Sequence, residues 1–129
     1  MNTRVLMTLA AVFMAIAGIT GTFLPREVLV IHHTEPGRGS VLVVQAAGAL
    51  YLGFAIMNWM SRGNLIGGIY SRPLALGNLV YFLNVALATA RIAADDPHAS
   101  AIVTAIIHSM FAVAFAYVAF GGMPRGAPR

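Results

Sequence analysis

One histidine lies inside an apolar stretch of this chain, where an ionisable side chain is uncommon. His108 falls in a run without charged residues over 99–124. On a helix with 100° per residue, Thr104, Phe111 and Phe115 share its face. Such an imidazole could relay protons or ligate a metal or haem, or it could stay neutral and donate to a neighbouring side chain or a backbone carbonyl. Ligation of haem by two imidazoles would need a second histidine at similar depth, and the apolar runs contain none.

A few other polar side chains also lie within apolar runs, and they complete the set of intramembrane candidates. Besides His108 these are Gln45, Tyr51, Tyr81 and Asn84. Tyr81 and Asn84 belong to one helical stripe that continues to Arg91, and an unpaired amide is costly in lipid, so we expect this stripe to face other helices. Gln45 or Tyr51 could complete a network with Asn84 and His108. The alternative is that these groups only bond neighbouring helices.

Residues that could ligate a metal gather in two predicted loops. They are His32, His33, Glu35, Asp95, Asp96 and His98. Nitrogen and oxygen ligands of this kind suit a divalent metal. Adjacent His32 and His33 cannot easily face the same ion, and a flexible loop does not hold its ligands in place. We therefore favour a solvated polar surface over a metal site, and we predict no cofactor.

Several kinds of catalysis are excluded or lack their usual residues. The chain has no cysteine, so it can form neither a thiolate metal site nor a thiol nucleophile. Gly63, Gly67 and Gly68 lie between two apolar runs and follow no strand, so they do not form a phosphate-binding loop. No serine elbow, zinc-protease motif or pair of intramembrane carboxylates is present. These patterns favour a protein that is not an enzyme.

The elements that must position these residues follow from composition. The chain has 129 residues, of which 59% are hydrophobic and 9% charged, whereas a soluble domain carries about 25% charged residues. Four runs lack charge, and each reaches the roughly 20 residues that cross a bilayer as a helix. We expect an all-α fold, a four-transmembrane-helix bundle in a single domain over 1–129. Its predicted helices are about 5–24, 41–61, 72–92 and 99–120.

The charged residues predict an orientation in the membrane. All eight basic residues are arginines, and five of them fall on the side of the two termini and the middle loop, against three on the other side. The positive-inside rule then places both termini in the cytoplasm. All four acidic residues fall on the outer side. The arginines are scattered singly at the ends of apolar runs, so they favour headgroup anchors over a nucleic-acid surface.

Two segments have competing interpretations. Ala15-Ile16-Ala17 resembles a signal-peptide cleavage site, but the apolar run continues to Leu24, so we expect a retained helix. The segment 27–34 could be a short extended segment or an interfacial helix. Small residues at four-residue spacing would let helices approach closely. These pairs are Ala17 with Gly21, Gly18 with Thr22, Ala49 with Gly53, and Ala112 with Ala116.

The stretch YLGFAIMNWMSRGNLIGGIYSRPLALGN, residues 51–78, resembles small bacterial four-helix integral membrane proteins to which no activity is assigned. The resemblance carries no functional residue over to this chain. It does imply a structured cytoplasmic corner and a location in the bacterial inner (cytoplasmic) membrane as a multi-pass protein. The corner residues are Asn58, Trp59, Tyr70, Arg72 and Asn78.

Together these features predict a non-enzymatic membrane protein that acts by helix packing with itself, with lipid or with a larger membrane assembly. The expected partners are membrane lipid and further copies of the chain in a homo-oligomer. The first alternative is a carrier of small molecules or ions that uses Asn84 and His108. The second alternative is a metal- or haem-dependent membrane enzyme.

Overall fold

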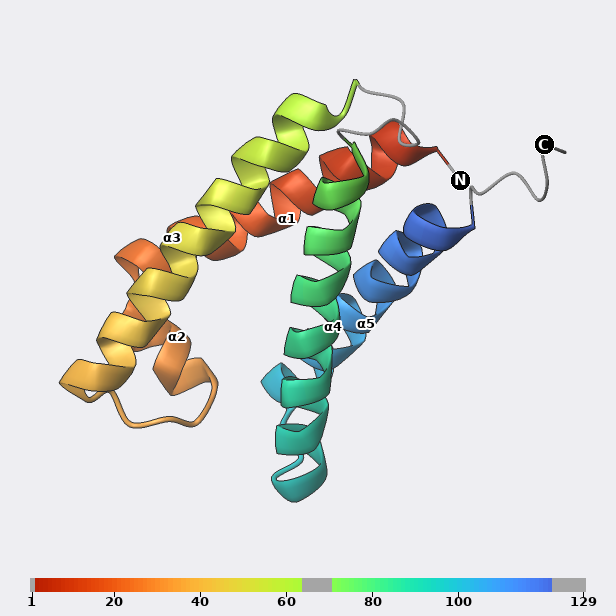
Figure 1. Ribbon diagram of the computed structural model, residues 1–129. Coiled ribbons are helices and arrows are strands. Elements are labelled where there is room, and N and C mark those ends of the chain that lie inside the picture. Colours follow the sequence, from red (N-terminus) through yellow and green to blue (C-terminus); the bar gives the residue numbers. More distant parts are fainter. Residues whose placement is uncertain (1, 64–70, 122–129) are drawn as a thin grey trace, which may run out of the picture. The chain divides into compact units, whose positions relative to one another are not determined.

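The computed structural model describes residues 2–63 and 71–121, and its regular secondary structure there is entirely helical (Figure 1). The five helices are α1 (Thr3–Phe23), α2 (Pro25–Ile31), α3 (Arg38–Ser61), α4 (Ser71–Asp95) and α5 (Ala99–Phe120). All except α2 are long and apolar enough to cross a membrane. The prediction of an all-α chain with four potential spans is therefore confirmed for the described residues.

The long helices extend slightly beyond the charge-free runs. Helix α3 begins at Arg38 rather than at 41, because the Ser40 hydroxyl accepts a hydrogen bond from the Gly37 N–H at 2.9 Å and satisfies one of the unpaired donors at the helix start. Asn2 does the same for α1, where its side-chain oxygen accepts from the Arg4 N–H at 3.1 Å. Capping hydrogen bonds therefore determine the residues at which these helices begin, which hydropathy alone does not predict.

Of the two forms open to segment 27–34, the structure contains a helix. Helix α2 starts at Pro25, which suits a first helical position because its fixed φ is helical and its missing N–H is not needed there. The valines and isoleucine that follow favour strands, but an isolated strand would leave its backbone groups unpaired beside lipid. A single short helix pairs them within itself.

The end of α2 depends on a histidine in an uncommon conformation. His33 has a φ of 55°, in the left-handed region. Its N–H donates to the Val30 carbonyl at 3.0 Å, and the Thr34 N–H donates to the Leu29 carbonyl at 2.9 Å. This pair of bonds is the Schellman arrangement that ends many helices, usually with glycine in the left-handed position. His33 therefore has a backbone role.

The chain divides into two compact units, residues 1–63 and residues 64–129, and each is described by itself. In unit 1, α1 and α3 pack antiparallel and approach most closely at glycines. A Cβ atom added to Gly48 would lie 2.6 Å from the Thr22 backbone nitrogen, and one added to Gly18 would lie 2.9 Å from the Gly48 carbonyl oxygen. The two backbones meet only because these positions lack side chains.

In unit 2, α4 and α5 pack antiparallel around aromatic rings. The Phe82 ring of α4 stacks on Phe111 and Phe115 of α5, with ring centroids 4.6 and 5.7 Å apart. Phe82 and Phe115 are fully buried. Small residues surround them on both helices, and Ala86 and Ala112 are also buried. The core of this hairpin is therefore a short aromatic stack between alanines.

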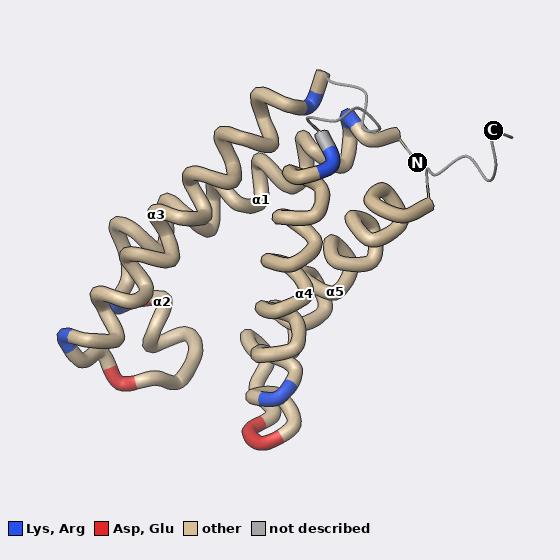
Figure 2. The backbone as a smooth tube through the Cα atoms, viewed as in Figure 1, with Lys and Arg blue, Asp and Glu red and all other residues tan. Residues whose placement is uncertain are grey.

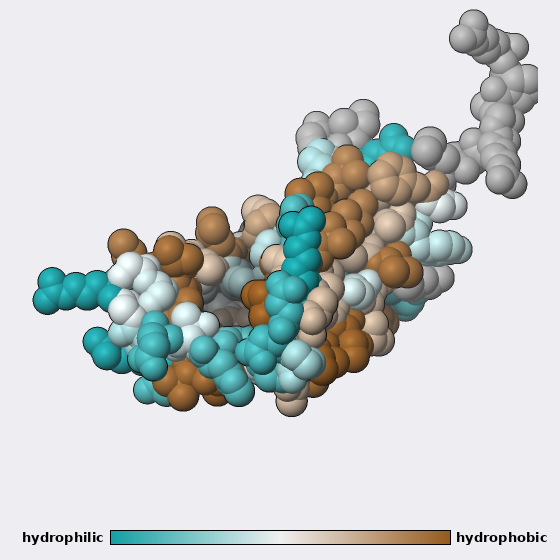
Figure 3. Space-filling model, turned by 90° about the horizontal axis from the view of Figure 1, so that it is seen from below, coloured by the Kyte–Doolittle hydropathy of each residue, from teal (hydrophilic) through white to brown (hydrophobic). Residues whose placement is uncertain are grey.

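The outward surfaces of the long helices are apolar, and the charges lie at helix ends. Figure 2 shows arginines and acidic residues near the ends of α1, α3 and α4, with long uncharged stretches between them. In Figure 3, hydrophobic side chains occupy the outer surface of the helices rather than only their interior. Only 11% of the most apolar stretch of α3 is buried. Surfaces of this kind are stable in hydrocarbon and would be unfavourable in water.

Candidate functional site

His108 lies inside unit 2, at the contact between α5 and α4. The residue is 2% exposed, and its ring centroid is 5.6 Å from that of Phe82 and 6.2 Å from that of Tyr81. Its Nδ1 lies 2.8 Å from the Thr104 carbonyl oxygen, one turn earlier on the same helix. The structure thus places this histidine against α4 and bonds it to a backbone carbonyl, one of the arrangements expected from sequence.

The Thr104 contact determines which nitrogen of His108 carries a proton. A carbonyl oxygen can only accept, so Nδ1 must donate. In a neutral ring Nε2 is then the acceptor, which is the nitrogen that could take a proton or bind a metal. Among the described residues, the groups of three or more potential metal ligands do not include His108. The arrangement therefore resembles a packed aromatic ring whose polar N–H is satisfied within its own helix.

The stripe of Tyr81 and Asn84 does not form one packed face in unit 2. Tyr81 contacts Phe82 edge to face at 5.2 Å and has a buried hydroxyl oxygen. Asn84 is exposed, and its Nδ2 donates to the Val80 carbonyl at 2.7 Å. Arg91 is exposed as well. In this unit the Val80 carbonyl, one turn away, accepts the hydrogen bond of the Asn84 amide, and the expectation that the stripe faces other helices stays a prediction.

Gln45 and Tyr51 lie on α3 in unit 1, in different settings. Gln45 is exposed, and its Nε2 donates to the Thr22 carbonyl of α1 at 3.4 Å. Tyr51 is half-buried. Gln45 therefore joins two helices of its own unit near the Gly48 contact, which is a packing role.

The residues of the predicted cytoplasmic corner are divided between the two units. Asn58 is fully buried in unit 1, where its Nδ2 donates to the Met14 sulfur at 3.4 Å. Asn78 is fully buried in unit 2, where its Nδ2 donates to the Leu74 carbonyl at 2.9 Å. Arg72 is exposed, and Tyr70 lies outside the described residues. The two asparagines are thus structural groups within their own hairpins.

Trp59, also a corner residue, takes part in a contact that the sequence interpretation did not include. The Arg62 guanidinium carbon lies 3.7 Å from the centroid of the Trp59 ring, and an Arg62 Nη1 hydrogen is donated to the Trp59 carbonyl oxygen. This is a cation–π pair between Trp59 of α3 and Arg62, which is three residues later and caps the end of that helix. The three-residue spacing is the signal that could have predicted it, since such pairs are neighbours on a helix surface.

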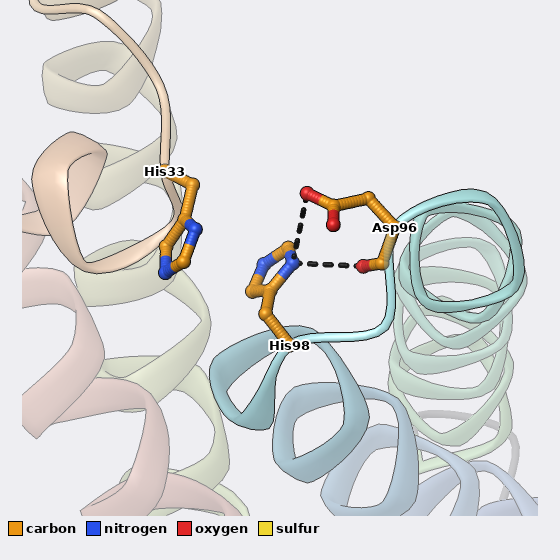
Figure 4. A group of neighbouring side chains, drawn as sticks. All are labelled: His33, Asp96 and His98. Carbon is orange, nitrogen blue, oxygen red and sulfur yellow. Dashed lines mark hydrogen bonds and ion pairs between the residues drawn. The ribbon is translucent and has the colours of Figure 1, made fainter.

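Of the potential metal ligands predicted in the two loops, Asp96 and His98 interact in unit 2. His98 Nδ1 lies 2.8 Å from the Asp96 carbonyl oxygen and 3.5 Å from its carboxylate Oδ2 (Figure 4). The His98 side chain is largely buried, whereas that of Asp96 is 72% exposed. The contacts join the two ends of the turn between α4 and α5. Asp95 is exposed at the end of α4.

The remaining three candidates belong to unit 1. His32 is half-buried at the end of α2, and His33 and Glu35 are exposed. Figure 4 also draws His33, which has the backbone role described above. Within this unit, backbone geometry accounts for the placement of the two histidines.

The helices define a class of protein, a helical chain with four segments able to cross a membrane. No family model, curated protein or solved structure matches this chain.

Proposed function

We propose that this chain is a small, non-enzymatic integral membrane protein that acts by packing its helices with further copies of itself, with lipid or with a larger membrane assembly. The observation that carries the proposal is that the buried polar side chains form hydrogen bonds within their own helices or hairpins. Asn58, Asn78 and His108 each donate to an atom of their own helix or hairpin. The Asn58 bond joins α3 to α1, and the bonds of Asn78 and His108 let these side chains be buried between helices without the cost of an unsatisfied donor.

The outward surfaces support the same proposal. On α3, Leu42, Val43, Leu50 and Met60 are each at least 66% exposed. Side chains of this size and number need an apolar neighbour, and lipid or another apolar helix supplies one. A four-helix bundle in the inner membrane, with its outer faces in contact with lipid and with other copies, fits these surfaces.

The orientation that we propose has both termini in the cytoplasm. Arg4, in the first turn of α1, and Arg62, at the end of α3, lie at the same end of the antiparallel pair in unit 1. The other end of that unit carries Arg26 and Arg38 together with two acidic residues. Each end of unit 1 thus carries two arginines, but over the whole chain five arginines fall on the side of Arg4 and Arg62 against three on the other side, which favours the cytoplasmic placement of that side.

The carrier alternative has less support. It needs Asn84 and His108 to share a polar path, but Asn84 is exposed and donates to Val80. His108 is buried among aromatic rings. We therefore do not propose a transport path along α4 and α5.

Native mass spectrometry of the whole protein, released from native membranes in mild detergent, tests the proposal. We expect a homo-oligomer, with a dimer as the commonest closed form, that carries phospholipid and no other small molecule. A stoichiometric metal, haem or other non-lipid ligand would instead favour the enzyme or the carrier. Crosslinking in native membranes provides the control, because an oligomer that forms only in detergent would not crosslink there.

A further inference from the structure

The surface of unit 1 contains an apolar groove between α1 and α3, with a volume of about 390 Å³. Ala11, Val12 and Ala15 line it on α1, and Leu52, Ile56 and Trp59 are among the residues that line it on α3. The alanines leave the hollow because their side chains are too short to fill it. Its volume lies within the range of about 300–1,000 Å³ that is typical of ligand sites.

An arginine lies beside one end of this groove, in contact with a wall residue. Trp59 forms part of the wall, and the Arg62 guanidinium lies over the same indole ring at 3.7 Å. Arg62 also donates to the Trp59 carbonyl oxygen, which holds the guanidinium in place. A guanidinium has five N–H donors in a planar fork, more than one carbonyl can accept, and this fork matches the oxygens of a phosphate.

The groove is oriented along the helices. The α3 wall from Trp59 to Leu52 is about 10 Å long, since a helix rises 1.5 Å per residue, and it leads away from Arg62 toward the middle of the helix. Helix α1 runs antiparallel, so Ala11 lies toward the end beside Arg62 and Ala15 lies deeper. A ligand that fits must therefore be apolar along its length and negatively charged at the end beside Arg62.

From this arrangement we propose that the groove binds one acyl chain of an anionic phospholipid, whose headgroup phosphate contacts Arg62. The proposal rests on the membrane insertion proposed above and names one lipid partner of that surface. The charge of the site is complementary to such a lipid, and anionic lipids are abundant in the cytoplasmic leaflet, where the positive-inside rule places Arg62. An apolar helix in the same place would cover the guanidinium without offering it acceptors.

The single tryptophan of the chain makes the proposal directly testable. Trp59 is the only tryptophan, and it forms part of the groove wall. The full chain would be reconstituted in vesicles of phosphatidylcholine that contain either brominated phosphatidylglycerol or brominated phosphatidylcholine at the same mole fraction. Bromine on the acyl chains quenches tryptophan fluorescence on contact, so the ratio of the two quenching curves reports the preference for the anionic lipid.

We expect phosphatidylglycerol to be preferred about fivefold by the natural protein, and the preference to disappear in Arg62→Gln. Arg38→Gln is the matched control, because it removes the same charge from the other end of α3 and should keep the preference. Since the ratio is taken within each variant, a change in the intrinsic fluorescence of Trp59 does not affect it. A preference that survives in Arg62→Gln would overturn the proposal.

A second pair of variants tests the groove itself. Ala15→Leu should fill it and reduce quenching by both lipids, whereas Ala49→Leu, on an exposed position of α3 outside the groove, should not. Circular dichroism of each variant confirms that the helices are intact. Unchanged quenching in a folded Ala15→Leu variant would overturn the acyl-chain contact.

Other occupants of the groove give different results. Equal quenching by the two lipids in the natural protein would mean ordinary contact with bulk lipid. No quenching by either would mean that protein, from the same chain or from a second copy, covers the groove. Both results overturn the lipid site while leaving the packing proposal intact. Failure of the chain to enter vesicles would instead overturn the proposed function.

Discussion

The ring of His108 lies 5.6 Å from the ring of Phe82, centroid to centroid, and its Nδ1 lies 2.8 Å from the Thr104 carbonyl oxygen. The first contact joins α5 to α4, and the second lies within α5. The imidazole thus serves as an aromatic surface for the neighbouring helix while its own helix satisfies its polar N–H. A phenyl ring could provide the first of these two contacts and would not need the second.

His108→Phe should therefore be tolerated, and His108→Ala should destabilise the protein by about 2 kcal/mol through the cavity it leaves. Thermal unfolding in detergent, followed by circular dichroism, measures both. Ile106→Ala is the control, because Ile106 lies on the same helix and is 54% exposed. If Phe at this position were as damaging as Ala, the imidazole nitrogens themselves would be required and the packing interpretation would fail.

Two glycines of α3 should respond oppositely to the same substitution. Gly48→Ala places a Cβ atom 2.6 Å from the Thr22 nitrogen and must separate α1 from α3, which should cost about 1–3 kcal/mol. Gly53→Ala meets nothing within 4 Å and should be neutral or stabilising by up to about 1 kcal/mol, because alanine favours the helix. Unfolding temperatures measured side by side decide this prediction. Equal losses at both positions would show that the close contact at Gly48 is not present.

His33→Gly should stabilise the end of α2. The φ of 55° costs a residue with a side chain about 1 kcal/mol, and glycine adopts it freely. His32→Gly is the control, because His32 has a φ of −93° and glycine there only adds freedom to the unfolded chain. Hydrogen exchange followed by mass spectrometry should show slower exchange of the Thr34 amide in His33→Gly and faster exchange in His32→Gly. Faster exchange in His33→Gly would contradict the Schellman arrangement.

Single cysteines test the proposed orientation, since the natural chain has none. Gly39 and Gly63 are exposed with open space around them, so cysteine at either position should not disturb packing. On intact cells an impermeant maleimide should label Gly39→Cys, and it should label Gly63→Cys only after the membrane is opened. Gly39 is preferable to Ser40, whose hydroxyl accepts from the Gly37 N–H. Labelling of Gly63→Cys alone on intact cells would reverse the topology.

The sequence by itself was enough to predict the four long helices and the face of α5 that carries His108. Every backbone group in lipid must be paired, so an uncharged apolar run of sufficient length has helix as its only stable local form. The period of 100° per residue then places Thr104, Phe111 and Phe115 on the His108 face. In the structure the Thr104 carbonyl accepts from His108, and both phenylalanines stack on Phe82.

Only the tertiary structure decided which of the many small residues make a helix contact. Sequence spacing favoured Gly18, Gly21 and Thr22 of α1 as well as Ala49 and Gly53 of α3. In unit 1 the first three lie at the closest approach, opposite Gly48, which belongs to none of the spaced pairs, whereas Ala49 and Gly53 are exposed. The reason is physical: an apolar face gains nothing by leaving lipid for another helix, so hydropathy does not distinguish a packed face from a lipid-facing one. Contact is decided by how closely two particular backbones fit, and that depends on both helices at once.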